Sequence, residues 1–149
     1  MARFQHVASS LLAALWFGSL SAIGFMAVPR LFALLPTATA GQTAAQLFAA
    51  QGWMSVACTL LLLILFRGRL RQWADAQVEE AMQTPRPDLL YMGLLITGLL
   101  LAMVLQWAVA PRIAMRQNLG FWHPLGTTLY VAQWLCALVA VSRLALRRN

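Results

Sequence analysis

Four long apolar runs with uncharged centres constrain this chain more than any other feature. Each run can cross a hydrocarbon layer of about 30 Å, which takes about 20 helical residues. Only helices or closed barrels can cross lipid, because every backbone polar group needs a partner there, and Leu- and Ala-rich runs without alternation exclude a barrel. The sequence therefore predicts an all-α membrane protein, a four-transmembrane-helix bundle with spans over residues 7–28, 47–66, 89–110 and 125–146.

The composition is incompatible with a soluble fold. Of the 149 residues 61% are hydrophobic and 10% are charged, too few charges to cover the surface of a soluble domain. The first run is too long for a signal peptide and is expected to be a retained helix. The cysteines Cys58 and Cys136 lie inside apolar runs and are expected to be packing residues. We expect a single membrane domain over residues 1–149.

Arginine placement predicts the orientation of the spans. The chain has a net charge of +7 and no Lys; eight Arg lie in the N-terminus, the loop 67–88 and the C-terminus, against three on the other side. The positive-inside rule puts the eight in the cytoplasm. We therefore expect a multi-pass protein of the bacterial inner membrane with both termini cytoplasmic and Arg143 reaching the headgroups. Its expected partners are membrane lipids and not nucleic acid, because no basic stripe carries interleaved aromatics.

The loop over residues 67–88 carries its own pattern. Apolar residues recur with a helical period from residue 69 to residue 82, and Thr84-Pro85-Arg86-Pro87 then stops the pattern. This predicts a short amphipathic helix that lies on the membrane surface or extends the second span.

The first and third spans end alike. Val28-Pro29-Arg30 in the first span is echoed by Ala110-Pro111-Arg112 in the third. We call the spacing of 82 positions from Pro29 to Pro111 the repeat offset. Cys58 and Cys136 are separated by nearly the same spacing and are expected at similar depth in the second and fourth spans. The echo predicts two tandem helical hairpins of the same orientation, related by a pseudo-twofold axis along the membrane normal. Proline should end or kink each helix at the interface, and the neighbouring arginine should anchor that end among phosphates.

A second interpretation makes these pairs part of a ligand site. Arg30 and Arg112 would line one outward-facing mouth, with Arg116 one helical turn beyond Arg112, and would attract an anion or lipid headgroups. His123 would be either an interfacial residue or a ligand-binding or proton-handling one. The candidate ligand-binding residues are Arg30, Phe32, Arg112, Arg116 and His123, and the expected structural residues are Trp16, Gly18, Pro29 and Pro111.

Small residues recur where helices could approach closely. They are spaced four residues apart in one stripe on the first span and in two pairs on the third: Ser10, Ala14, Gly18 and Ala22, then Gly93 with Thr97 and Gly98 with Ala102. Such residues favour packing inside the bundle or, alternatively, a homo-oligomer.

Catalytic, metal and cofactor sites are not expected. No Ser-His-Asp set, phosphate loop or carboxylate pair shares one span end. His6, before the first span, and His123, before the fourth, are expected on opposite sides of the membrane, too far apart to share one metal or haem. A copper(I) site of His123 with Met115 or Met26 stays an alternative. The polar residues at depth could bond between helices or line a thin polar path: Ser19, Ser21, Gln51, Ser55, Thr59, Thr97, Gln106 and Gln133.

Several short motifs carry a family resemblance. They are Trp16-Phe17-Gly18, Val28-Pro29-Arg30-Leu31-Phe32 with Leu35-Pro36, Ala40-Gly41, Leu47-Phe48, Ala110-Pro111-Arg112-Ile113 and Phe121 with His123. In this order the chain resembles the bacterial domain-of-unknown-function family that is similar to transmembrane protein 205. The resemblance implies a four-helix membrane protein and leaves its activity open. Members often have Ser three residues after the His, where this chain has Gly126.

These observations favour a non-enzymatic inner-membrane protein with a small anion, lipid-headgroup or ligand site at its outer face. Two alternatives stay open. One is transport or resistance involving a small molecule or a metal such as copper, which predicts a polar cavity reaching Gln51 or Gln106. The other is a structural or assembly partner that acts through the small-residue stripes and the amphipathic helix of the cytoplasmic loop.

Overall fold

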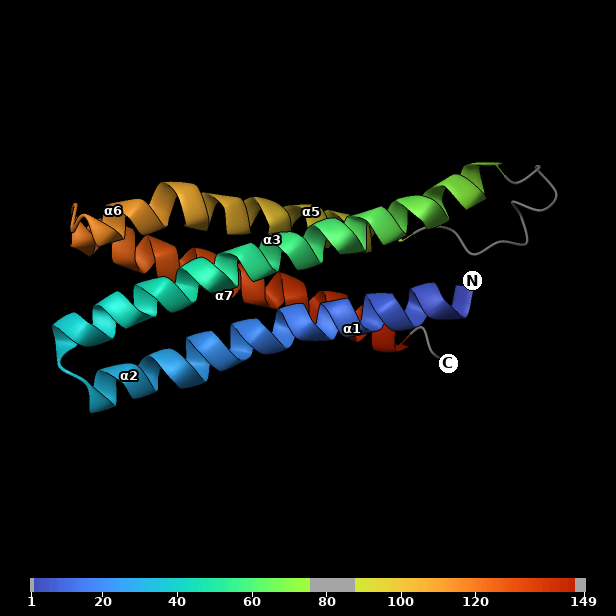
Figure 1. The fold of residues 1–149 in the computed structure, drawn as a ribbon. Coiled ribbons are helices and arrows are strands. Elements are labelled where there is room, and N and C mark those ends of the chain that lie inside the picture. Colours follow the sequence, from blue (N-terminus) through green and yellow to red (C-terminus); the bar gives the residue numbers. More distant parts are fainter. Residues whose placement is uncertain (1, 76–87, 147–149) are drawn as a thin grey trace.

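The computed structural model describes residues 2–75 and 88–146, and the regular elements of this part are all helices (Figure 1). In chain order they are α1 (Ala2–Ser21), the π-helix η1 (Ala22–Ala27), α2 (Val28–Leu34), α3 (Thr37–Asp75), α5 (Leu89–Val104), the π-helix η2 (Leu105–Val109), α6 (Ala110–Ala114) and α7 (Leu119–Leu146). They join into four helical stretches long and apolar enough to cross a membrane: Phe4–Leu34, Thr37–Gly68, Leu89–Ala114 and Leu119–Leu146. The predicted all-α four-helix membrane bundle is confirmed.

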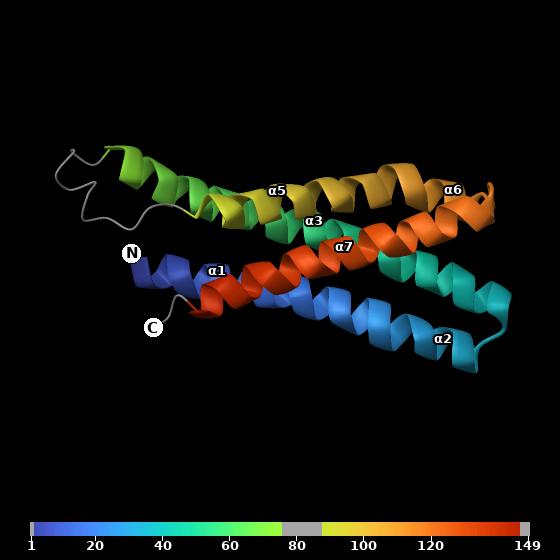
Figure 2. The ribbon, with the colours of Figure 1, turned by 180° about the vertical axis from the view of Figure 1, so that it is seen from behind.

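The four long helices alternate in direction, and each packs against two neighbours. α1 and α5 each contact both α3 and α7, so α1 lies diagonal to α5 and α3 diagonal to α7. The start of α1 and the end of α7 lie at one end of the bundle, the terminal end, together with the end of α3 and the start of α5 (Figures 1 and 2). The turns after α2 and α6 lie at the opposite end, the turn end.

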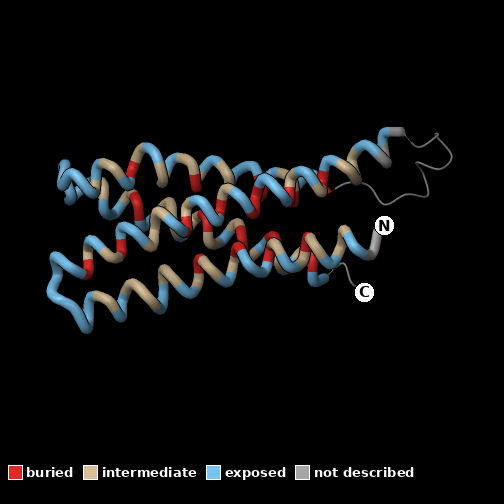
Figure 3. The backbone as a smooth tube through the Cα atoms, viewed as in Figure 1, coloured by how far each residue is buried: buried red, intermediate tan, exposed pale blue. Residues whose placement is uncertain are grey.

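The two halves of the chain bury equivalent positions. Each buried residue of α1 is matched, at the repeat offset, by a buried residue of α5: Ser9, Ala13, Trp16 and Leu20 against Tyr91, Leu95, Gly98 and Ala102. The same offset relates buried residues of α3 and α7: Ala44, Gln51, Ser55, Cys58 and Leu62 against Gly126, Gln133, Ala137, Ala140 and Leu144 (Figure 3). The repeat therefore runs through all four helices. Cys58 is equivalent to Ala140, so matching it with Cys136 was wrong.

A π-helical turn precedes each Pro-Arg pair. The N–H of Val28 donates to the carbonyl of Ile23, and the equivalent N–H of Ala110 donates to the carbonyl of Leu105. Each bond reaches five residues back because the following proline lacks an N–H and its ring crowds the carbonyl four residues before it. The helices then continue to Leu34 and to Ala114, so of the two predicted outcomes, a helix end or a kink, the helix end does not occur.

Two other expectations change in the structure. α3 begins ten residues before the predicted second span and continues to Asp75, which extends the span into the start of the expected amphipathic helix. The rest of that helix, residues 76–82, lies outside the described residues. Gly98 and Ala102 pack inside the bundle as predicted, but Ala14, Gly18 and Ala22 face outward because the larger Trp16 and Leu20 occupy the inner face of α1.

Candidate functional site

The arginines of the turn end have no acidic residue in their own segments. Residues 29–46 and 111–124 contain no Asp or Glu, and Arg30, Arg112 and Arg116 are exposed. All four acidic residues of the chain lie between positions 75 and 88 of the sequence, and Asp88 stands at the start of α5, at the terminal end of the bundle. An anion from outside the chain can therefore approach these guanidinium groups without competition from a carboxylate in the same segments.

Arg112 is held against an aromatic ring. Its guanidinium carbon lies 4.3 Å from the ring centroid of Trp122, which is half-buried in the first turn of α7. Trp122 in turn meets Phe121 edge to face, with ring centroids 5.1 Å apart. A cation–π contact at an exposed site contributes about 0.5–1 kcal/mol. It orients the guanidinium while leaving the N–H groups at its edge able to donate to an anion.

Arg116 closes the helix that carries Arg112. Its φ is 54°, its N–H donates to the carbonyl of Ile113 at 3.0 Å, and the N–H of Gln117 donates to the carbonyl of Arg112 at 2.9 Å. These two bonds form a Schellman motif, in which the left-handed position is usually Gly. The prediction that Arg116 lies one helical turn beyond Arg112 is wrong, because α6 ends at Ala114.

The candidate residues form two groups rather than one mouth. Arg30 and Phe32 lie on α2, which packs against η1 and α3, whereas α6 packs against η2, α7 and α3. Figures 1 and 2 both show α2 and α6 on opposite sides of the turn end. Exposed His123 follows Trp122 on α7. We refer to the second group, Arg112, Arg116, Trp122 and His123, as the basic turn.

One family model matches most of the chain. Residues 11–121 match the family described as Domain of unknown function (DUF4149). The chain belongs to the DUF4149 family. The match includes both Pro-Arg pairs and Arg116 and ends before His123. No curated protein and no solved structure matches the chain.

Metal ligands do not gather in the part of this DUF4149 protein that the structure describes. Residues 2–75 and 88–146 contain no group of three or more His, Cys, Asp or Glu that could hold a metal ion. Of the copper(I) donors suggested by the sequence, Met26 lies on η1, while Met115 and His123 flank the turn between α6 and α7. Both methionine side chains are exposed.

Polar side chains of the DUF4149 bundle connect helices at mid-depth. The amide nitrogen of Gln51 donates to the Ser19 hydroxyl at 3.2 Å and to the Ser55 hydroxyl at 3.1 Å. Two α7 residues that the sequence did not single out also bond to α1. Tyr130 donates its hydroxyl to the Leu20 carbonyl at 2.8 Å, and the Trp134 indole N–H donates to Ser21 at 2.9 Å. The predicted interhelical use of these polar groups is therefore present at several positions.

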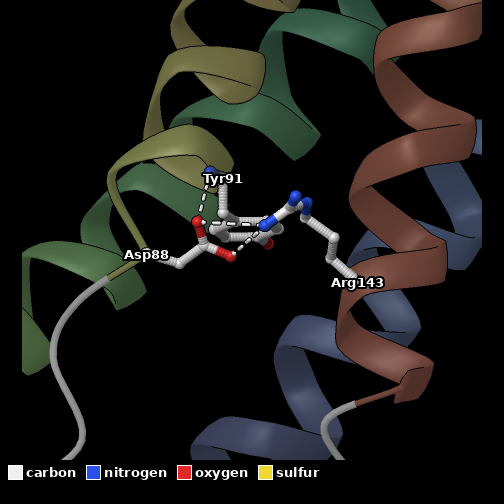
Figure 4. A network of polar contacts seen from close by, with 3 residues as sticks. All are labelled: Asp88, Tyr91 and Arg143. Carbon is white, nitrogen blue, oxygen red and sulfur yellow. Dashed lines mark hydrogen bonds and ion pairs between the residues drawn. The ribbon is translucent and has the colours of Figure 1, made fainter.

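An ion pair joins two helices at the terminal end (Figure 4). The Asp88 carboxylate accepts a bond from the Tyr91 N–H at 3.0 Å, which caps α5, and lies 3.1 Å from an Arg143 guanidinium nitrogen on α7. Arg143, expected among the headgroups, is therefore tied to the protein. Orientation rules give acids little weight, and for that reason sequence reasoning overlooked Asp88.

Proposed function

We propose that this DUF4149 protein is a non-enzymatic protein of the bacterial inner membrane that binds anionic lipid headgroups through the basic turn. The observation that carries the proposal is Arg112, stacked on Trp122 in segments without a carboxylate. The proposed orientation has both termini in the cytoplasm. It is supported by the eight arginines of the terminal segments and the loop 67–88.

The chemistry of the basic turn suits a lipid phosphate. A guanidinium group donates two parallel N–H bonds to phosphate oxygens, and Arg116 adds a second positive charge in the same turn. Tryptophan rings prefer the headgroup level of a bilayer, which is where the end of a membrane-spanning helix lies. Trp122 therefore favours a lipid phosphate over a free anion, because the ring keeps the turn at headgroup depth.

Native mass spectrometry with phosphatidylglycerol as the probe tests this proposal. Arg112→Gln should weaken retention of the lipid about fivefold, since an arginine near an anionic surface contributes about 1 kcal/mol. Arg30→Gln is the matched control, because it removes the same charge at the same end but outside the basic turn. Equal losses in the two variants would show general charge attraction and would contradict a site at the basic turn.

A homo-oligomer is a second proposal. A Cβ on Gly18 would meet nothing within 4 Å, and Ala14 and Ala22 on the same stripe are exposed. Such a surface allows close approach of another helix. Disulfide cross-linking of a Gly18→Cys variant in bilayers should give dimers, and purely monomeric protein would contradict this proposal.

The order of the sequence motifs supports a further proposal about ancestry. Trp16 and the two Pro-Arg pairs lie within the matched residues 11–121, and we infer that this DUF4149 protein is similar to transmembrane protein 205.

A further inference from the structure

Two contacts between equivalent residues mark the pseudo-twofold axis of the bundle. Phe48 and Tyr130, which are separated by the repeat offset, meet edge to face with ring centroids 5.3 Å apart. Trp16 and Gly98, separated by the same offset, also pack directly against each other. A twofold axis relates equivalent positions, so residues that meet their own equivalents must lie beside it. The axis therefore runs along the centre of the bundle and passes between the two members of each pair.

Gln51 and Gln133 are a third equivalent pair, one helical turn from Phe48 and Tyr130. Since α3 and α7 both run from the turn end to the terminal end, the two amides lie deeper than the aromatic pair. Their exposed fractions are 3% for Gln51 and 2% for Gln133. Both bonding partners of Gln51 from the protein, Ser19 and Ser55, lie on the α1 and α3 side of the bundle.

Three buried polar atoms on residues at or next to the axis contacts have no partner within the described residues. They are the amide oxygen of Gln51, the amide nitrogen of Gln133 and the indole nitrogen of Trp16. A buried donor or acceptor without a partner is energetically unfavourable, and the lipid around the bundle supplies no replacement. One acceptor and two donors are therefore available to a guest that can both donate and accept hydrogen bonds.

We propose that Gln51 and Gln133 form a binding site on the pseudo-twofold axis for a small neutral hydrogen-bonding molecule. Water is the smallest such molecule, and a small alcohol or amide offers the same chemistry. The guest is neutral because none of the three unpaired groups is ionisable and no charged residue lies within ten positions of either glutamine along the chain except Arg143 at the far end of α7. In membrane proteins built from repeats, substrate sites commonly lie at the repeat interface near the midplane.

The two pairs of equivalent residues beside the axis cover the site on both sides. Toward the turn end, Phe48 and Tyr130 form a half-buried aromatic lid, which is fixed by the bond from the Tyr130 hydroxyl to Leu20. Toward the terminal end, Trp16 is fully buried on Gly98. The guest therefore enters from the turn end, past the more exposed lid.

Reaction of an introduced thiol with 2-hydroxyethyl methanethiosulfonate, a small neutral hydrogen-bonding probe, tests the site. The background carries Cys58→Ala and Cys136→Ala, and the protein is reconstituted in liposomes. Gln133→Cys should react at least about tenfold faster than Ala140→Cys, a fully buried position two turns deeper on the same helix, because the reagent needs a hydrated thiolate. Adding Tyr130→Ala to Gln133→Cys should speed the reaction further by opening the lid.

The nature of the guest is tested in the same assay. The thiol is then placed at Ala137, a buried position one helical turn from Gln133, so that both glutamines are kept. Protection of Ala137→Cys by millimolar acetamide would show that a small solute occupies the site, and fast reaction without protection would show that water fills it. Equal, slow reaction of Gln133→Cys and Ala140→Cys would overturn the proposal. A high-resolution structure of the unmodified protein in lipid provides an independent check. It should show density bridging the two amides, and a direct Gln51–Gln133 hydrogen bond with no guest would also overturn the site.

Discussion

The indole of Trp16 lies directly over Gly98, its own equivalent in the second half of the chain. A large residue on α1 is thus matched by the smallest residue at the same place on α5. The two hairpins keep one register of buried positions but differ in side-chain size where they meet. This difference lets two diagonal helices approach across the centre of the bundle.

Adding a methyl group at Gly98 should destabilise the bundle. A Cβ at this position would overlap the Trp16 ring, whereas a Cβ on Gly93, exposed on the same helix, would meet nothing within 4 Å. Overpacking a core in this way costs about 1–3 kcal/mol. Gly98→Ala should therefore lower the free energy of unfolding in mixed micelles by that amount. Gly93→Ala should instead raise it by about 0.5–1 kcal/mol, because alanine favours a helix more than glycine does. Similar effects of the two variants would contradict the packing described.

The Asp88–Arg143 ion pair should be measurable apart from the cap that Asp88 provides. Asn is also a good N-cap residue, so Asp88→Asn removes the charge but keeps the bond to α5. A double-mutant cycle of Asp88→Asn with Arg143→Gln should give a coupling energy of about 1 kcal/mol. This value lies between those of exposed and buried pairs because the Arg143 side chain is 40% exposed. Asp88→Ala should cost about 1 kcal/mol more, from the lost cap. A coupling energy near zero would mean that the ion pair does not stabilise the fold.

Arg116→Gly should separate stability from lipid binding. Glycine adopts the left-handed conformation of this position without strain, so the free energy of unfolding should rise by about 0.5–1 kcal/mol. Retention of phosphatidylglycerol should fall because the guanidinium is lost. Gln117→Gly, at the next residue, should instead lower the free energy of unfolding, since only the entropy of the unfolded chain changes there. Loss of stability in Arg116→Gly would argue against the Schellman geometry.

The features that depend on hydropathy and charge along the chain could be predicted. Uncharged apolar runs fix the number of crossing helices, and the Pro29 and Pro111 echoes gave the repeat offset that the burial pattern follows. Matching Cys58 with Cys136 was wrong because two residues of one type at similar depth need not be equivalent in the repeat. Gln51 and Gln133 stand at that same offset in the sequence, but two polar residues become significant only when the helix faces are known.

The geometry at the helix ends could not be predicted. Whether a proline ends a helix or is accommodated by a π-turn depends on neighbouring packing, which supports the continued helix after Pro29 and Pro111. The position of Arg116 depends on a left-handed turn that residue type would assign to Gly. Arg30 and Arg112 lie apart because alternate helices of an antiparallel four-helix bundle are diagonal, a consequence of three-dimensional order rather than of either motif.

The most direct test of the repeat is a cross-link between equivalent residues at its axis. The background is again Cys58→Ala with Cys136→Ala, and the reagent is a short bis-methanethiosulfonate. Phe48→Cys with Tyr130→Cys should form an intramolecular bridge, detected as a linked peptide pair by mass spectrometry. The reason is that the native side chains meet, with ring centroids 5.3 Å apart.

The matched control is Trp53→Cys with Leu135→Cys. These residues are also equivalent and lie at similar depth, but they are 57% and 48% exposed on the outside of the bundle. The account predicts an efficient bridge between positions 48 and 130 and none within one chain between positions 53 and 135. Absence of the first bridge, or equal formation of both, would contradict two related hairpins packed around a common axis.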